Sequence, residues 1–337
     1  MFFCANVKAD LVISKDPASP FSDILVGDTT VTLGSFKMVA TTDNYLVTEM
    51  KFSAVGGTAV NSYSLYDGST VLSTLPGGVA AYFVGLSVPV PINTSKRLTV
   101  KANLSPIDGV SATNGTALSV GLSTPNAVKA YDSTGTQVLS GSQTAIGNSM
   151  ALYKTKPCFT FNFNSPHGEI APSLDTLLAR FDVSADAHGD VNFQNANGNI
   201  LTVNISGIQY PDGMPNIFTL KTISGTTLDS LSVPEGANSM TFDFSALGLD
   251  VGAGQTQPFY IYGDTRDYAS IQLWLDDNNP NNVGWGIDGS GNYHEADKLF
   301  RGDIYGNALV NPTVTPEPST IVLLITGLAS LFLRRKK

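Results

Sequence analysis

The residues best suited to chemistry lie in one polar segment, residues 274–297, which reads WLDDNNPNNVGWGIDGSGNYHEAD. Its Gly, Asn and Pro content indicates turns that carry both carboxylates and amides. Calcium takes about six to eight oxygen ligands from carboxylates, amides and backbone carbonyls in flexible loops. The segment is therefore a candidate calcium site, and the residues that would supply ligands are Asp276, Asp277, Asn278 and Asp288.

Two alternatives stay open for this segment. The acids also fit ordinary solvated turns, because residues 288–291 read as a hairpin turn and the EF-hand spacing is missing. Trp274 and Trp285 flank the acids. If they are exposed, their rings can stack on sugars, and if they are buried, they belong to the core. Calcium is the one cofactor that the residues suggest.

No motif in the sequence indicates catalysis. His167, His188 and His294 are far apart and lack the spacing of zinc ligands. The Gly-x-Ser-x-Gly turn of many hydrolases does not occur. We therefore expect that the protein is not an enzyme, and an enzyme acting on extracellular polymers is the weakest of the functions considered.

The segments that must position these residues read as short strands joined by turns. Residues 96–105 alternate between apolar and polar positions. The face predicted to be buried carries Leu98, Val100, Ala102 and Leu104. Asp67-Gly68 lies between β-rich flanks and predicts a hairpin over residues 60–75. The body has no long amphipathic helical pattern, so an all-β fold is expected.

The second half of the body reads as a diverged copy of the first. Residues 33–57 parallel residues 177–209, and the hairpin at 65–75 parallels residues 220–231. This predicts two tandem immunoglobulin-like β-sandwich domains, at residues 10–150 and 157–312. The stretches SLYDGSTVLS and NTSKRLTVKANL also resemble strands of tandem β-sandwich repeats in bacterial surface proteins.

The charge balance restricts the classes of partner. The formal net charge is −9, and leaving out the last four residues, all cations, takes it to −13. Nucleic acid is excluded as an expected partner, because phosphate contacts require basic patches. An acidic body suits a soluble surface protein, with divalent cations bridging it to matrix polymers.

The last 25 residues, 313–337, differ in composition from the body. A linker rich in proline ends in Pro316, Glu317 and Pro318, where the prolines prevent a helix interior. An uncharged apolar stretch, residues 319–333, follows, and it predicts a short transmembrane helix. Its apolar residues are Ile321, Val322, Leu323, Leu324, Ile325, Leu328, Leu331, Phe332 and Leu333. The basic end consists of Arg334, Arg335, Lys336 and Lys337.

The order of these parts predicts an orientation. A cationic cluster stays on the cytoplasmic side of a membrane, which places the body outside. A helix of the globular core would carry a polar face at helical spacing, and this run does not.

The tail resembles the bacterial PEP-CTERM sorting signal. The resemblance is carried by Pro316-Glu317-Pro318, by Ser319-Thr320 and by Arg334-Arg335, over about the last 22 residues. It implies export, recognition of the tail by an exosortase in the membrane, and delivery to the cell surface or to exopolysaccharide. The cell envelope is the expected location, with membrane anchoring before processing and a surface or extracellular position afterwards.

The N-terminal residues show no complete signal peptide. Residues 1–9 resemble the end of an apolar region with a small-residue cleavage site, so we expect a remnant of a signal peptide. Cys4 and Cys158 are the two cysteines. If Cys4 is removed with the signal, no disulfide framework exists, and we expect Cys158 to be a buried thiol.

These observations favour one function and leave an alternative. The favoured function is that of an exported structural or adhesive protein of the cell surface or extracellular matrix. The alternative is a module that binds carbohydrate or another matrix ligand, ice included. Ice-binding faces usually carry regular rows of threonine, and the threonines here have no fixed short period.

Overall fold

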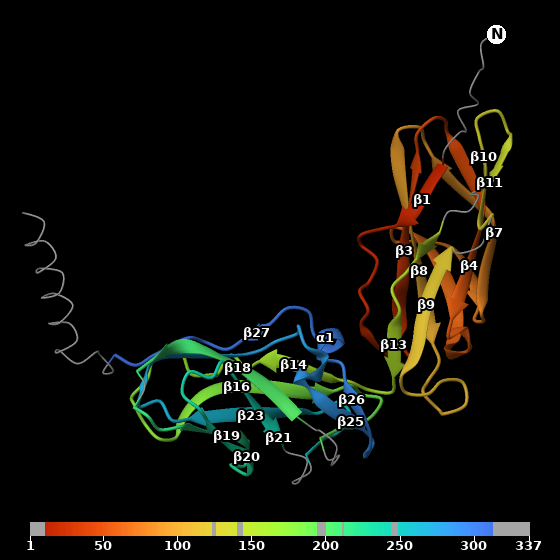
Figure 1. Cartoon of the computed structure of the whole chain (residues 1–337). Helices are drawn as coiled ribbons and strands as arrows, with labels where there is room; N and C mark the ends of the chain where they lie inside the picture. The colour runs from red at the N-terminus through yellow and green to blue at the C-terminus, as the bar shows by residue number, and fades with distance from the viewer. Residues whose placement is uncertain are drawn as a thin grey trace, which may run out of the picture. The chain divides into compact units, whose positions relative to one another are not determined.

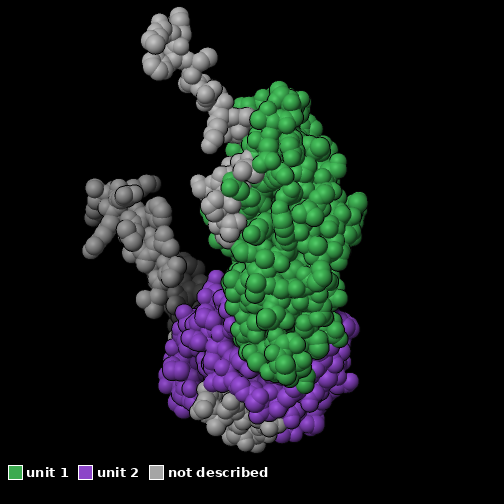
Figure 2. Space-filling model, turned by 90° about the vertical axis from the view of Figure 1, so that its right-hand side faces the viewer, with its two compact units in different colours: residues 1–156 green, residues 157–337 purple. Residues whose placement is uncertain are grey.

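The computed structural model describes residues 11–122, 126–139, 144–193, 200–210, 212–243 and 249–312. The chain divides into two compact units, residues 1–156 and 157–337 (Figure 2). Both units are built from strands, so the predicted all-β class is confirmed (Figure 1). The segment predicted as a signal remnant and the predicted sorting tail lie outside the described residues. Within the described part, no helix is both long and apolar enough to cross a bilayer.

Unit 1 contains two sheets. The first has five strands, in the order β1 (Leu11–Lys15), β3 (Thr30–Ala40), β8 (Thr94–Leu104), β5 (Val60–Asp67) and β6 (Thr70–Pro76). The second has the order β11 (Gln137–Leu139), β10 (Val128–Tyr131), β4 (Tyr45–Val55), β9 (Thr116–Leu122), β13 (Met150–Tyr153) and β2 (Ile24–Val26). Beside this path, β7 (Ala80–Val90) pairs with β4, and β12 (Ala145–Ile146) pairs with β9. A short 3-10 helix, η1 (Gly57–Ala59), links β4 to β5.

The two sheets of unit 1 share one apolar core. Phe36 of β3 and Phe52 of β4 come from different sheets, and their ring centroids lie 5.0 Å apart. Phe83 of β7 adds an edge-on contact to Phe52 at 6.0 Å. All three side chains are fully buried. Because aromatic rings from facing sheets interdigitate, unit 1 is a β-sandwich.

The predicted periodicity of residues 96–105 matches β8. Its four apolar residues, at positions 98, 100, 102 and 104, are all buried, and the positions between them are half-buried or exposed. The predicted hairpin is also present, with Asp67 opposite Thr70 in the β5–β6 ladder. Gly68 at this turn has φ +58°, which a residue without a Cβ adopts at little cost.

The described part of unit 2 contains three sheets. The first has the order β14 (Pro157–Phe161), β16 (Thr176–Ala185), β23 (Thr256–Gly263), β19 (Asn216–Thr222) and β20 (Thr227–Val233). The second has the order β15 (Gly168–Glu169), β28 (Leu309–Val310), β24 (Tyr268–Leu275), β18 (Ile200–Gln209) and β21 (Ser239–Asp243), and β27 (Ile304–Tyr305) pairs with β24. The third has the order β22 (Asp250–Val251), β17 (Val191–Asn192), β25 (Gly284–Ile287) and β26 (Ser290–His294). The described part of the unit also contains two short helices, η2 (Pro280–Asn282) and α1 (Ala296–Leu299).

The two units repeat one sheet topology. In the first sheet of each unit, β1, β3, β8, β5 and β6 correspond in order to β14, β16, β23, β19 and β20. In the second sheet, β4 pairs with β7 and β9 as β18 pairs with β21 and β24. The parallel pair β13–β2 recurs as β28–β15. The shared order supports the tandem repeat, whereas the immunoglobulin-like assignment stays a prediction.

The expectation of a buried thiol at Cys158 was wrong. Cys158 is a free cysteine on the exposed side of β14. Successive residues of a strand face opposite sides of the sheet, and the neighbours Pro157 and Phe159 are the buried ones. Strand register, rather than residue type, decides the position of this thiol.

Candidate functional site

The sorting motif Pro316-Glu317-Pro318, the apolar stretch 319–333 and the basic end 334–337 lie outside the described residues. The polar segment 274–297, in contrast, is described throughout. It begins at the end of β24 and runs through η2, β25 and β26 to α1.

The structure brings Asp276 and Asp277 together with Asp303. One carboxylate oxygen of each residue lies within 4.8 Å of the others. The strand pairing explains the grouping, because Leu275 of β24 lies opposite Ile304 of β27. In an antiparallel pair, Asp276, which follows Leu275, must then face Asp303, which precedes Ile304. Asp303 was not among the predicted ligands, because this pairing joins residues that are separated in the chain.

Hydrogen bonds hold the Asp276 carboxylate in place. Its Oδ1 accepts from the backbone N–H of Asn278 at 2.8 Å and from the Asn278 side chain, and its Oδ2 accepts from Asn204 Nδ2 at 3.3 Å. Burial acts to raise the pKa of Asp276, but these hydrogen bonds and one with Asp303 outweigh it and lower the pKa. The carboxylate therefore stays ionised near neutral pH.

The two other carboxylates of this group are also tied to nearby groups. Asp277 Oδ2 accepts from the backbone N–H of Gly302 at 2.6 Å. Asp303 Oδ2 accepts from the Tyr305 hydroxyl at 2.6 Å, and this hydrogen bond raises the pKa of Tyr305. Asp303 Oδ1 is buried and has no hydrogen-bond partner among the described residues. The group thus combines a negative charge with an oxygen that lacks a donor.

The other two predicted ligands have different surroundings. Asn278 is exposed and donates to Asp276 from both its backbone and its side chain. Asp288 lies at the β25–β26 turn, where its Oδ1 accepts from the Asp190 backbone N–H at 3.2 Å. Its own backbone N–H donates to the Asp190 carbonyl at 3.2 Å. Asp288 therefore does not belong to the group formed by Asp276, Asp277 and Asp303, and calcium at these positions stays a prediction.

The two tryptophans occupy different environments. Trp285 is fully buried, with its ring centroid 5.1 Å from that of Tyr293. A buried ring cannot stack on a sugar, so Trp285 is a core residue and its predicted ligand-stacking role is wrong. Trp274 is half-buried and stacks on Tyr305, with centroids 5.8 Å apart and planes 28° apart. Tyr305 itself is 54% exposed.

An aromatic pair and a carboxylate group therefore adjoin on the second sheet of unit 2. Trp274 lies opposite Tyr305 in the β24–β27 ladder, and the Tyr305 hydroxyl reaches into the carboxylate group at Asp303. Flat apolar rings beside oxygen acceptors suit a sugar ring that carries hydroxyl groups. The arrangement can bind a polyhydroxylated ligand, a cation, or both.

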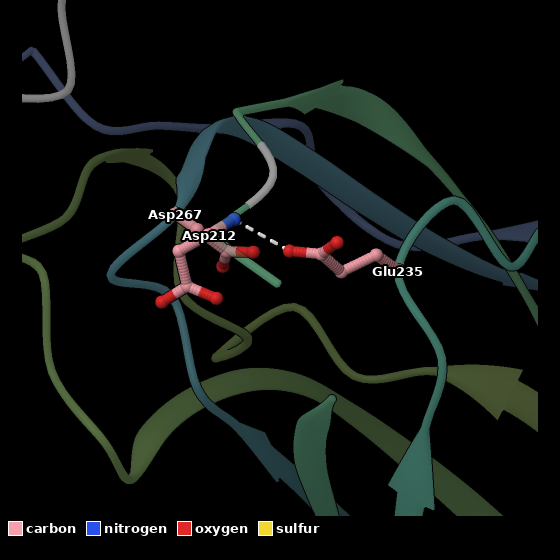
Figure 3. Close-up of side chains that lie close together, drawn as sticks. All are labelled: Asp212, Glu235 and Asp267. Carbon is pink, nitrogen blue, oxygen red and sulfur yellow. Dashed lines mark hydrogen bonds between the residues drawn. The ribbon is translucent and has the colours of Figure 1, made fainter. Parts of the chain in front are cut away.

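A second carboxylate group, at another position in unit 2, consists of Asp212, Glu235 and Asp267 (Figure 3). One oxygen of each lies within 4.8 Å of the others. No sequence pattern pointed to these residues, since each comes from a different loop. The only indication in the sequence was that the three loops contain turn-forming residues, which many surface turns share.

Comparisons with known proteins assign no family. No model of a known protein family matches the chain. No curated protein matches its sequence either.

Several solved structures resemble parts of the fold. A family 123 glycoside hydrolase from Clostridium perfringens aligns at 9% identity and TM-score 0.24, covering 46% of this chain and 26% of the hydrolase. A tip adhesin from Pseudomonas aeruginosa aligns at 7% identity and TM-score 0.24, covering 89% of this chain and 97% of the adhesin. A serine-rich repeat adhesion glycoprotein from Streptococcus agalactiae aligns at 8% identity and TM-score 0.19, covering 91% and 96%. Identities and TM-scores this low identify neither a family nor a function.

Proposed function

We propose that this chain is an exported, non-enzymatic structural or adhesive protein of the cell surface or extracellular matrix, sorted through a PEP-CTERM tail. The observation that carries the proposal is the tail sequence. Pro316-Glu317-Pro318, the uncharged stretch 319–333 and the cluster 334–337 follow one another in the order that resembles this signal. The proposed partners are an exosortase and, through the predicted helix of the tail, the membrane.

The body of the chain is compatible with that role. The net negative charge of the chain lies in unit 2, whereas acids and cations nearly balance in unit 1, and an acidic unit suits a protein presented among anionic matrix polymers through bridging cations. Exopolysaccharide is the proposed matrix contact. The proposed location is the cell envelope before processing, and the cell surface or the extracellular space afterwards.

The test is the intact mass of the protein recovered from the outer surface of its native host. We expect a mass that lacks the residues beyond about Pro318. Changing all three residues of Pro316-Glu317-Pro318 to alanine should retain the tail and keep the protein in the membrane. The control is Pro312→Ala, which alters a proline outside the motif and should be processed normally.

Two results would overturn the proposal. One is a surface protein whose mass retains IVLLITGLASLFLRRKK, which would indicate a plain membrane anchor. The other is normal processing of the triple alanine variant. Circular dichroism of each variant establishes that the body remains folded, so that a sorting defect is not mistaken for a folding defect.

The pair Trp274 and Tyr305 favours a second candidate function, binding of a carbohydrate matrix ligand. Tyr305 is exposed, and its hydroxyl is held by Asp303. The pair therefore presents a fixed aromatic surface next to carboxylate oxygens. This function is compatible with the first, because an adhesive protein requires a binding surface.

A further inference from the structure

We propose that unit 2 has a calcium site formed by Asp212, Glu235 and Asp267, where three loops meet at one end of the sandwich. Asp212 lies between β18 and β19, Glu235 between β20 and β21, and Asp267 between β23 and β24. Figure 3 shows the three carboxyl groups turned toward a common space. One oxygen of each lies within 4.8 Å of the others.

The buried carboxylate of Asp267 is the main argument for an ion. Asp267 is only 7% exposed. Its Oδ2 accepts from Gln209 Nε2 at 2.6 Å and from Asn216 Nδ2 at 3.3 Å. Its Oδ1 is buried and has no hydrogen-bond partner among the described residues. A buried charged oxygen without a donor is costly, and a cation at the common space satisfies it.

The two amides that donate to Asp267 Oδ2 fix the orientation of its carboxylate. Metal ligands are commonly oriented by neighbouring hydrogen bonds in the same way. Gln209 donates to Asp267 with its side-chain nitrogen, and its Oε1 accepts from the Gly236 backbone N–H at 2.9 Å. The same side chain thus links the Asp267 carboxylate to the loop that carries Glu235. Hydrogen bonds of this kind fix the orientation of carboxylate ligands and are part of most metal sites.

Glu235 and Asp212 are held by backbone contacts. Glu235 Oε1 accepts from the backbone N–H groups of Asp212 at 2.5 Å and Gly213 at 2.8 Å. Asp212 Oδ1 accepts from the Met214 N–H at 2.9 Å. These contacts bring the two loops together and fix the two carboxylates close to Asp267.

The local charge remains negative despite one nearby cation. Arg266 is bound to Asp264 through Nε and Nη2, at 2.6 to 3.2 Å. The contact with Asp264 raises the pKa of Arg266, and the charges of Asp212 and Asp267 add to the effect. Among the described residues, Arg266 is thus paired with Asp264 and not with Asp212, Glu235 or Asp267.

The geometry favours calcium over magnesium. Ca²⁺ accepts about six to eight oxygens in flexible geometry, whereas Mg²⁺ requires near-ideal octahedral order. Three ligands from three irregular loops suit the flexible coordination of Ca²⁺. Backbone carbonyls and water would complete the coordination.

The site is open to solvent. Asp212 is exposed and Glu235 is half-buried. A groove of about 280 Å³ adjoins the site, and Gln209, Gly236 and Tyr268 are among the residues that line it. An ion can therefore approach the group from the side of the exposed Asp212.

Unit 1 shows that the fold does not require these acids. Its equivalent loops lie between β4 and β5 and between β6 and β7. They meet through glycine backbone, since a Cβ on Gly57 would lie 2.0 Å from the Gly78 carbonyl oxygen. Tyr63 closes the contact by donating its hydroxyl to the same oxygen at 2.9 Å. The carboxylates of Asp212 and Glu235 are thus an addition to the repeat and not a feature of its folding.

The test is calcium binding by the chelator-treated full chain, measured by isothermal titration with CaCl₂ and then MgCl₂. We expect Ca²⁺ to bind with a dissociation constant of about 10⁻⁵ to 10⁻³ M. Glu235→Gln should weaken binding at this site at least tenfold, and Asp267→Asn should abolish it. Thermal unfolding of the wild-type protein should move to higher temperature with Ca²⁺, and that of Glu235→Gln should move less.

Two control variants test whether Ca²⁺ binds at Asp212, Glu235 and Asp267 and not at another group of acids. Asp108→Asn removes a carboxylate from the loop of unit 1 that corresponds to the loop of Asp267, and it should bind Ca²⁺ as the wild type does. The double variant Asp276→Asn with Asp277→Asn should leave Ca²⁺ binding at Asp212, Glu235 and Asp267 unchanged. If Asp267→Asn does not fold, Glu235→Gln provides the test. Its amide oxygen can still accept the hydrogen bonds from the two backbone N–H groups, so the loop should keep its structure.

Three outcomes would overturn the proposal. The first is no Ca²⁺ binding by the wild type up to about ten times the weakest expected dissociation constant. The second is unchanged binding by Glu235→Gln. The third is complete loss of binding in the double variant at Asp276 and Asp277, which would place the ion there. Tighter binding of Mg²⁺ than of Ca²⁺ would overturn the assignment to calcium.

Discussion

Trp274 and Tyr305 stack on one another across the β24–β27 ladder, with ring centroids 5.8 Å apart. If this pair binds matrix carbohydrate, Trp274→Ala and Tyr305→Ala should each weaken binding of the host's exopolysaccharide. Stacked aromatic contacts contribute about 0.5–1.5 kcal/mol, which corresponds to a loss of up to about tenfold. The measurement is titration of purified exopolysaccharide into each full-length variant.

The control for this prediction is Tyr82→Ala. Tyr82 is 49% exposed but lies in unit 1, away from the aromatic pair in sequence and in sheet. Binding should not change in this variant. Wild-type affinity in a folded Trp274→Ala variant would rule out a binding role for the pair.

The core of unit 1 depends on the aromatic rings that join its two sheets. Phe52→Ala should reduce the free energy of unfolding by about 3–5 kcal/mol, because it removes a large buried side chain and leaves a cavity between Phe36 and Phe83. Scanning calorimetry and urea denaturation measure the change. Val110→Ala, at a residue 91% exposed, should change it by less than about 0.5 kcal/mol. Equal effects of the two changes would contradict the proposed core.

The pair Asp16 and Arg97 should make the stability of unit 1 depend on pH. Asp16 is buried, and it accepts from the Ala18 N–H at 2.7 Å and from Arg97 Nε at 2.8 Å. Burial acts to raise the pKa of Asp16, but these contacts outweigh it and lower the pKa below the ordinary 3.8. The pair therefore stabilises the fold above about pH 4, and the stabilisation is lost as the pH falls toward the folded-state pKa.

The corresponding variant is Arg97→Gln. Because Arg97 is more than half exposed and solvent screens its charge, we expect a loss of only about 1 kcal/mol at pH 7. The difference from the wild type should shrink as the pH is lowered below about 4, toward the pKa of Asp16 in the folded protein. Urea denaturation over this pH range measures it. Lys51→Gln removes a cation elsewhere in the same unit. The difference in free energy of unfolding between this variant and the wild type should not change with the protonation of Asp16.

Local sequence determined the strands and their faces. The alternation at Leu98 and Val100 specifies which side of β8 is buried, because successive side chains of a strand face opposite sides whatever the strand pairs with. Asp67-Gly68 specifies a hairpin turn for the same local reason. The similarity of the two halves and the composition of the tail are likewise properties of the chain read in order.

Tertiary structure decided which of these strands are neighbours, and thereby the candidate sites. Asp303 joins Asp276 only because β27 pairs with β24, and Asp267 meets Glu235 only because three loops reach the same end of unit 2. Trp274 and Trp285 are both tryptophans in one polar segment, yet the packing of the sheets buries only Trp285 completely. Pairing and packing depend on contacts between distant residues, so a pattern read along the chain contains too little information to predict them.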